Sequence, residues 1–187
     1  MSTKHSKAAE TFLKNRSLAA WHDETLWMVR AKRDKMSKAV PEWEHLRDMA
    51  CAIKMYSNSH LDQLLVEFEK NAKANGAHVY WAKDAEEYCS IVARILEEHQ
   101  VKHFIKSKSM LAEECGLNEY LEQKGVEVVE SDLGERILQL MHKKPSHIVL
   151  PAIHVKKEEI GELFVKEMGT EPGNNDQTYL THAARKN

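Results

Sequence analysis

The spacing of apolar residues changes once along the chain, near Gly76. Before this glycine, apolar residues recur every three or four positions, as in the run from Leu61 to Phe68, and this spacing predicts amphipathic helices. Pro41 is expected to separate two of them, and the glycine closes the last one because it tolerates the left-handed backbone that ends helices. Residues 1–75 are therefore expected to form a helical extension.

After Gly76, short apolar runs alternate four times with amphipathic segments. The runs are AHVYW at 77–81, VKHFI at 101–105, VEVV at 126–129 and HIVL at 147–150. Parallel strands need long crossover connections, and the segments between these runs have helical patterns of suitable length. The sequence therefore predicts an α/β domain over residues 76–187, with a parallel sheet of about four strands and flanking helices.

The last residues of the chain, 171–187, begin another helical pattern that is still running at Asn187. No glycine or proline that would cap a helix follows it. Together with the small number of strands, this pattern suggests an incomplete domain. The α/β region is therefore expected to be the N-terminal half of a larger one.

The composition is that of an ordinary soluble globular protein, with 30% charged residues, 42% hydrophobic residues and a formal net charge of -2. This balance argues against nucleic-acid binding. No apolar run approaches the roughly 18 to 20 residues that span a bilayer, and the first residues lack the apolar core of a secretory signal. We therefore expect no membrane-spanning segment and a cytoplasmic location.

The three cysteines, Cys51, Cys89 and Cys115, lie far apart and form no C-x-x-C pair. Disulfide frameworks, thiolate metal sites and iron–sulfur sites need clustered or regularly spaced cysteines. We therefore expect no metal or cofactor to be held by this chain.

The most polar of the loops that follow the predicted strands is Lys106-Ser107-Lys108-Ser109. In an open α/β sheet, ligands bind beyond the carboxyl ends of the strands. Two ammonium groups beside a helix start, whose free N–H groups also attract negative charge, favour a phosphate or a carboxylate. A solvated connector explains the same residues, because the stretch is not a glycine-rich phosphate loop. The sequence leaves both interpretations open.

The loops after the third and fourth runs supply three candidate catalytic residues, Asp132, Glu135 and His154. The two acids suit a substrate hydroxyl or the lysines across a crevice, but acidic residues also favour a helix N-terminus for its own sake. The histidine is the candidate general acid or base because imidazole titrates near neutral pH. It is one of 11 histidines, and no H-E-x-x-H spacing indicates a metal.

Several motifs in this order resemble the LUD (lactate utilisation) domain. They are KSKSM at 106–110, Glu114, Leu117-Asn118-Glu119, ESDLGERILQL at 130–140 and PSHIVLPAIH at 145–154. Upstream stretches are similar to the iron–sulfur subunit of the bacterial three-protein L-lactate oxidation complex. These are RAKRDKM at 30–36, VPEWEHLRDMACAIK at 40–54 and the segment 61–87.

This resemblance implies a fold related to the sugar-phosphate isomerase and CoA-transferase-like group, and a role in oxidising L-lactate to pyruvate. The strand-end motifs of the family place its candidate ligand-binding residues at Lys106, Ser107, Lys108, Ser109, Glu114, Asn118, Asp132, Glu135 and His154. Members of the subunit family continue into a second α/β half and a segment whose clustered cysteines hold [4Fe–4S] centres. Neither is found in this sequence, so the chain is expected to be the N-terminal part of such a protein.

Three functions remain open at this point. In the first, the chain is a ligand-binding and assembly module that holds a small carboxylate or phosphate, contacts other subunits of the complex, and is inactive alone. In the second, it is a free-standing isomerase or acyl-CoA-transferase-like enzyme, since a fold does not fix a function. In the third, it is a structural interaction module with a large apolar face on its first 75 residues.

Overall fold

The computed structural model describes residues 2–186 and divides into two compact units. One unit, here called the α/β unit, combines the residues up to Thr25 with those from Lys83 onward. The other, here called the helical arm, is Leu26–Ala82. The sequence suggested a single boundary at residue 75. In the structure, the first helix and the start of the second instead group with the α/β unit.

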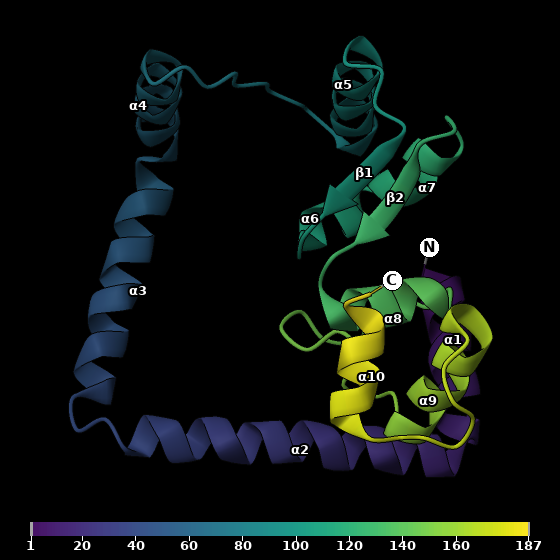
Figure 1. The fold of residues 1–187 in the computed structure, drawn as a ribbon. Coiled ribbons are helices and arrows are strands. Elements are labelled where there is room, and N and C mark those ends of the chain that lie inside the picture. The colour runs from purple at the N-terminus through teal and green to yellow at the C-terminus, as the bar shows by residue number, and fades with distance from the viewer. Residues whose placement is uncertain (1, 187) are drawn as a thin grey trace. The chain divides into compact units, whose positions relative to one another are not determined.

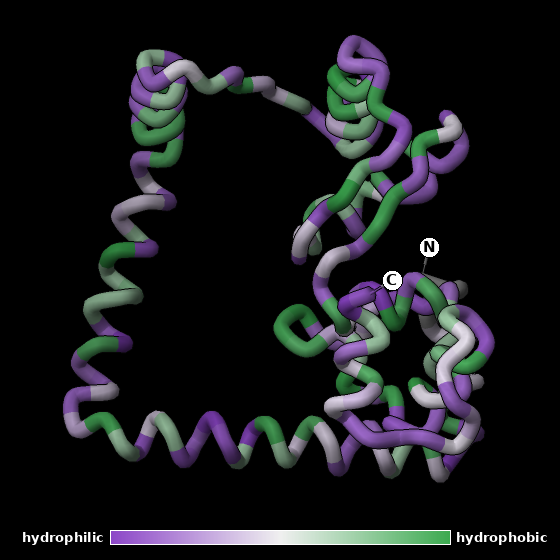
Figure 2. The backbone as a smooth tube through the Cα atoms, in the orientation of Figure 1, coloured by the Kyte–Doolittle hydropathy of each residue, from purple (hydrophilic) through white to green (hydrophobic). Residues whose placement is uncertain are grey.

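The helical arm consists of the end of α2 (Arg16–Lys38), α3 (Trp43–Ser59) and α4 (Leu61–Ala74), followed by an extended segment. No residue between 26 and 82 is buried. Apolar and polar residues alternate along α3 and α4 (Figure 2), as the sequence predicts. Their apolar side chains are nevertheless exposed, for example Ile53 at 63% and Phe68 at 63%.

The sheet of the α/β unit has two parallel strands, β1 (His103–Lys106) and β2 (Glu127–Glu130), which lie side by side in Figure 1. Two short helices, α6 (Met110–Glu114) and α7 (Leu117–Glu122), form the crossover between them. The α/β class with a parallel sheet and flanking helices is therefore confirmed. Helices make up most of the chain, and the sheet is smaller than the sequence suggested.

Helix α5 (Ala85–Glu98) leads into this sheet and supplies much of its core. The Asp84 carboxylate accepts a hydrogen bond from the Glu87 N–H at 2.9 Å, and Glu87 accepts one from the Lys83 N–H at 2.9 Å. The Asp84 cap and the bond to the preceding residue together fix the start of the helix. The first apolar core then gathers residues of α5, α6, α7 and β2: Cys89, Ala93, Leu96, Ala112, Leu117, Leu121 and Val128.

A second apolar core lies among α8 (Leu133–Leu140), α9 (Lys157–Met168) and α10 (Gln177–Ala184). Its buried members are Ile137, Phe164 and Leu180. Helix α8 contacts both β2 and α9, so it links the two cores. The side chain of Gln139 on α8 also serves β2 directly: it accepts from the Glu130 N–H at 3.2 Å and donates to the Val128 carbonyl at 2.7 Å.

Helix α1 (Ser2–Lys14) and the first turns of α2 belong to the same unit. The indole N–H of Trp21 donates to the carbonyl of His154 at 3.1 Å, and the ring of Phe12 meets His22 edge-on. None of the helices in residues 2–186 combines the length and the apolar character needed to cross a membrane.

Two of the four expected strands do not form. The run at 77–81 is extended but pairs with no other strand, and Tyr80 and Trp81 are half exposed. The run at 147–150 folds into a turn in which the N–H groups of Val149 and Leu150 donate to Nδ1 of His147. A backbone whose donors are satisfied within its own turn has no need of a neighbouring strand.

Candidate functional site

The two strands end beside each other, and their last residues carry opposite charges. In the parallel register, Lys106 of β1 is the partner of Glu130 of β2. Side chains along a strand alternate between faces, so Glu130 lies on the same buried face as Val128. The Lys106 side chain is only 6% exposed and that of Glu130 only 1%. The ion pair between them is therefore almost completely removed from water.

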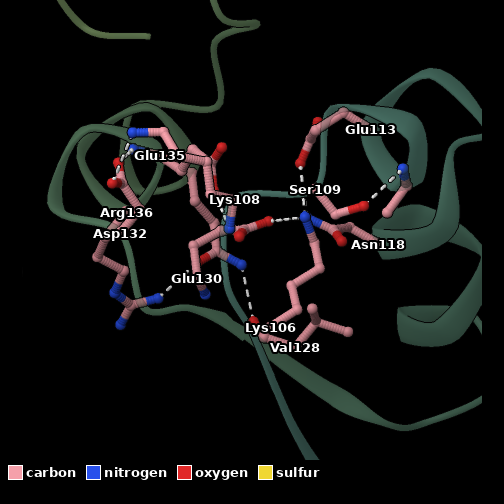
Figure 3. A network of polar contacts seen from close by, with 12 residues as sticks. Lys106, Lys108, Ser109, Glu113, Asn118, Val128, Glu130, Asp132, Glu135 and Arg136 are labelled. Carbon is pink, nitrogen blue, oxygen red and sulfur yellow. Dashed lines mark hydrogen bonds and ion pairs between the residues drawn. The ribbon is translucent and has the colours of Figure 1, made fainter. Parts of the chain in front are cut away.

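A second carboxylate and an amide complete the surroundings of the Lys106 ammonium. Glu113 Oε1, from α6, lies 3.3 Å from Lys106 Nζ, and Figure 3 shows the ammonium between the carboxyl groups of Glu113 and Glu130. The Asn118 amide donates to Glu113 Oε1 at 3.1 Å and to Glu130 Oε1 at 2.8 Å. We call Lys106, Glu113, Asn118, Glu130 and Glu135 the Lys106 cluster.

Glu135 joins this cluster to the loop after β1. Its Oε2 accepts a hydrogen bond from the Lys108 N–H at 3.1 Å, and the Lys108 ammonium lies 3.0 Å from Asp132 Oδ2. Lys108 has a positive φ of 40°, a backbone conformation uncommon outside glycine. Asp132 caps α8 by accepting from the N–H groups of Gly134 and Glu135 at 3.0 and 3.2 Å.

The balance of burial and charge decides the protonation of these groups. Burial works against the Lys106 ammonium, but Glu130 and Glu113 outweigh it and hold the pKa of Lys106 above its usual value. Burial raises the pKa of Glu113 despite the attraction of Lys106, because Glu130 adds a second negative charge nearby. The two directions are compatible: one ammonium is shared by two carboxyl groups, and the ion pair with Glu130 is the closer.

Three buried acceptor atoms in the cluster have no hydrogen-bond donor among the described residues: Asn118 Oδ1, Glu130 Oε2 and Glu135 Oε1. A buried polar atom that loses water without gaining a partner costs about 1–3 kcal/mol. The cluster is thus rich in acceptors. Its ammonium already has two carboxylate partners, and the more accessible cation is Lys108, whose side chain is 43% exposed.

The structure brings together most of the residues singled out from the sequence. Around the strand ends lie Lys106, Lys108, Ser109, Asn118, Asp132 and Glu135. Ser109 caps α6 by accepting from the Ala112 N–H at 3.3 Å. Ser107, in the same loop, and Glu114, on α6, are exposed. The ligand-binding role of all these residues remains a prediction.

His154 belongs to different surroundings. Its Nδ1 lies 2.7 Å from Ser146 Oγ, and its ring centroid is 6.2 Å from that of His22. Burial, His22 and Lys143 together lower the pKa of His154, and none of these influences comes from the Lys106 cluster. The segment before it does reach α8, since a Cβ added at Gly134 would lie 3.4 Å from Pro151. The imidazole ring itself lies beside Ser146 and beside His22 of α2.

The sequence did not indicate Glu113, and it placed Glu130 after the third run without predicting its burial or its partner. The family motif indicated the neighbouring Glu114, but the Glu114 side chain is exposed and Glu113 is the one that reaches Lys106. Glu130 ends an apolar strand two positions after Val128, so strand alternation could have indicated that it is buried on the same face. Its pairing with Lys106 depends on the register of the two strands, which no local pattern specifies.

Two surface hollows among the described residues have volumes suited to a small molecule and lie away from the Lys106 cluster. One, of about 360 Å³, lies in the helical arm and is lined by Lys73 and residues 76–80. The other, of about 370 Å³, lies between the ends of α9 and α10, beside Tyr179 and His182. At the strand ends themselves, the cation that a ligand can reach is Lys108, whose side chain is 43% exposed.

The chain offers no ligand set for an iron–sulfur cluster in the part that the structure describes. Cys51 is exposed on α3, and Cys89 is buried in α5, where its thiol donates to the carbonyl of Cys115 at 3.4 Å. Between residues 2 and 186, no group of three or more His, Cys, Asp or Glu side chains is arranged to hold a metal ion. The residues present do not fit such a cofactor.

Comparison with known proteins finds close relatives over most of the chain. Lactate utilization protein B of Exiguobacterium sp. is 42% identical over 145 residues, covering 78% of this chain and 31% of that protein. The protein of the same name from Bacillus pumilus is 41% identical over 141 residues, covering 75% and 30%. The one from Bacillus subtilis is 38% identical over 156 residues, covering 83% and 33%.

The chain thus spans about a third of the length of these relatives. No solved structure shows a significant match. Residues 65–187, which include both strands and every member of the Lys106 cluster, match the LUD domain. By this match over most of its length, the chain belongs to the LUD domain family.

Proposed function

We propose that this chain is the N-terminal part of a lactate utilisation iron–sulfur protein that acts in the oxidation of L-lactate to pyruvate with electron transfer. The observation that carries the proposal is the similarity of 38–42% to proteins named Lactate utilization protein B over most of the chain. The part described here serves as a ligand-binding and assembly module. Electron transfer would belong to iron–sulfur clusters held elsewhere in the full-length protein, because the described residues of this chain include no suitable ligand set.

The ligand-binding role is assigned to the loop after β1. Lys108 presents a half-exposed ammonium, and Ser107 is exposed next to it. A small carboxylate can replace Asp132 as the partner of Lys108, because an exposed ion pair contributes only about 0–1 kcal/mol and is easily exchanged. The buried ion pair of Lys106 and Glu130 would then hold the strand ends in place beneath the ligand.

The assembly role is assigned to the helical arm. Its apolar side chains, such as Met49 at 48% and Ile53 at 63% exposure, are spaced for one face of a helix. Exposed apolar surface of this kind often marks contacts with other proteins. The partners would be the other subunits of the lactate-oxidising complex.

Isothermal titration calorimetry with L-lactate and with pyruvate tests the ligand-binding role on the full 187-residue chain. We expect saturable binding that weakens about tenfold or more in Lys108→Ala, since a hydrogen bond to a charged group contributes about 1.5–3 kcal/mol. Lys102→Ala is the matched control, because this exposed lysine lies just before β1 and away from the strand ends.

Two results would count against the role. Heat-silent titrations with both acids, repeated by ligand-observed NMR with the same outcome, would remove the ligand-binding part of the proposal. Equal weakening in Lys108→Ala and Lys102→Ala would show that only general charge attraction is at work.

A further inference from the structure

Two carboxyl groups in the Lys106 cluster face each other with one oxygen each left over. Glu130 uses Oε1 for Lys106 and Asn118, and its Oε2 has no donor. Glu135 uses Oε2 for the Lys108 N–H, and its Oε1 has no donor. The two carboxyl groups lie within hydrogen-bonding reach of each other. Both residues are more than nine-tenths buried, at 2% and 4% exposure.

Two ionised carboxylates in this position would be unstable. They would repel each other where water cannot screen them, and each would keep a buried oxygen without a partner. Lys106 cannot correct this, because its ammonium is held between Glu130 and Glu113 on the other side. One proton between the two groups removes the repulsion and gives both oxygens a partner at once.

We propose that Glu130 and Glu135 share one proton and that this acid pair is a pH-sensitive latch between strand β2 and helix α8. The inference concerns the protein alone and does not depend on any ligand. Neither the family match nor the names of the relatives mention such a device.

The charges around the pair fit this assignment. Lys106 faces it from β1, Glu113 from α6, and Asn118 from α7. Asp132 and Lys108 pair with each other in the flanking loops, and the charge of Asp132 adds to the rise in the pKa of Glu135. Burial, and after it the charge of Glu130, raises the pKa of Glu135. With one shared proton, the carboxyl groups of Glu113, Glu130 and Glu135 and the Lys106 ammonium carry a net charge of about -1 rather than -2.

Loss of the proton should loosen one specific connection. Glu135 anchors the Lys108 backbone, and it lies in the first turn of α8, which Asp132 caps. Repulsion between Glu130 and Glu135 would therefore separate the start of α8 from the loop after β1. A carboxyl group with a raised pKa stabilises the fold while it is protonated, so the latch is closed at low pH. It opens as pH rises through the raised pKa of Glu135.

The test uses NMR on the full chain with ¹³C-labelled glutamate, titrated from about pH 4 to pH 9, the range in which buried glutamates titrate. We expect the carboxyl of Glu135 to titrate above the ordinary range, as a signal separate from that of Glu113, whose pKa is also raised. In parallel, the hydrogen-exchange protection of the Lys108 amide, corrected for the intrinsic effect of pH, should fall at least about tenfold as that group ionises.

The key variant is Glu135→Gln, whose amide can donate to Glu130 and still accept from Lys108, as the protonated acid does. It should remove the high-pH titration and keep the Lys108 amide protected up to pH 9, the top of that range. Glu130→Gln is the second variant, in case the first does not fold. Glu122→Gln, an exposed position at the end of α7, is the matched control and should behave as the unchanged protein.

The latch is wrong if Glu135 titrates in the ordinary range of about 4 to 5, whatever the behaviour of Glu113. It is also wrong if the Lys108 amide loses protection equally at all pH values in Glu135→Gln, which would indicate a purely structural role. A failure to bind lactate or pyruvate would leave these results unchanged, so the two proposals fail separately.

Discussion

The α/β unit and the helical arm share the same spacing of apolar residues, but only the α/β unit buries them. Both contain amphipathic helices with apolar residues at helical spacing. In the α/β unit that spacing leads to burial, as for Leu121 at 0% and Phe164 at 1% exposure. In the arm, the same spacing leaves every residue between 26 and 82 at least partly accessible.

The difference shows what periodicity does and does not specify. A period of three to four residues determines that a helix has an apolar face, but the partner that covers the face must come from elsewhere in the fold. In the α/β unit, β2 and the short crossover helices supply that partner to α5. Three predictions, from the largest expected effect to the smallest, test whether the two regions differ in solution as they do here.

The largest effect is expected from one pair of phenylalanine truncations. Phe164→Ala should lower the free energy of unfolding by about 3–5 kcal/mol, because it leaves a cavity in the second core. Phe68→Ala in the arm should change it by no more than about 0.5 kcal/mol, since that side chain is 63% exposed. Urea unfolding followed by circular dichroism measures both. Equal losses would mean that the arm has a covered apolar face in solution.

The next contrast is between a buried and an exposed ion pair. Lys106→Met should cost about 3 kcal/mol at neutral pH, because it leaves buried carboxylates without their cation. Arg47→Met removes an exposed pair with Glu44 in the arm and should cost less than about 1 kcal/mol. Thermal unfolding at several pH values provides the measurement.

The pH dependence of the stability cost also distinguishes the two ion pairs. The cost of Lys106→Met should shrink as pH falls, because Glu113 and Glu130 no longer need a cation once they are protonated. A cost that is the same at acid and neutral pH would argue for a packing effect of the lysine stem.

The smallest effect is expected at the helix starts. Asp132→Ala should cost about 1–2 kcal/mol, because the carboxylate caps α8 and holds Lys108. Glu42→Ala before α3 should cost almost nothing, since the Glu42 side chain makes no capping hydrogen bond. Chemical unfolding of both variants beside the unchanged protein measures the difference.

The pH dependence of the Asp132 effect follows from its pKa. Burial would raise it, but Lys108 and the N–H groups of Glu135 and Gly134 prevail, so the pKa of Asp132 lies below its usual range. Its stabilising contribution is therefore complete above the ordinary aspartate pKa of about 3.9 and disappears as pH falls below it. A cost that persists unchanged in strong acid would exclude the carboxylate as its source.

Local patterns predicted the α/β class and both strands that form. The runs at 101–105 and 126–129 became β1 and β2 within a residue or two, and Asp84 caps α5 by accepting from the Glu87 N–H. These features depend on residues close together in sequence. The prediction of a strand at 147–150 was wrong because Nδ1 of His147 accepts hydrogen bonds from the N–H groups of Val149 and Leu150. Hydrophobicity does not reveal this local alternative.

The sequence predicted that several polar side chains would meet at the strand ends, but not how they pair there. Lysines and acids follow successive strands, and parallel strands bring such loops together, so these side chains were expected at one end of the sheet. The structure then pairs Lys106 with buried Glu130 and leaves Lys108 as the accessible cation. That distinction depends on strand register and on which face each residue occupies, and both are set by contacts between distant segments.

The side chain of Gln139 affects the edge at which the sheet could gain another strand. By bonding to the N–H of Glu130 and the carbonyl of Val128, it occupies the margin of β2 that faces away from β1. An incoming strand would have to displace this amide before it could pair there. Enlargement of the sheet, whether by more of the same polypeptide or by another one, is therefore expected on the β1 side.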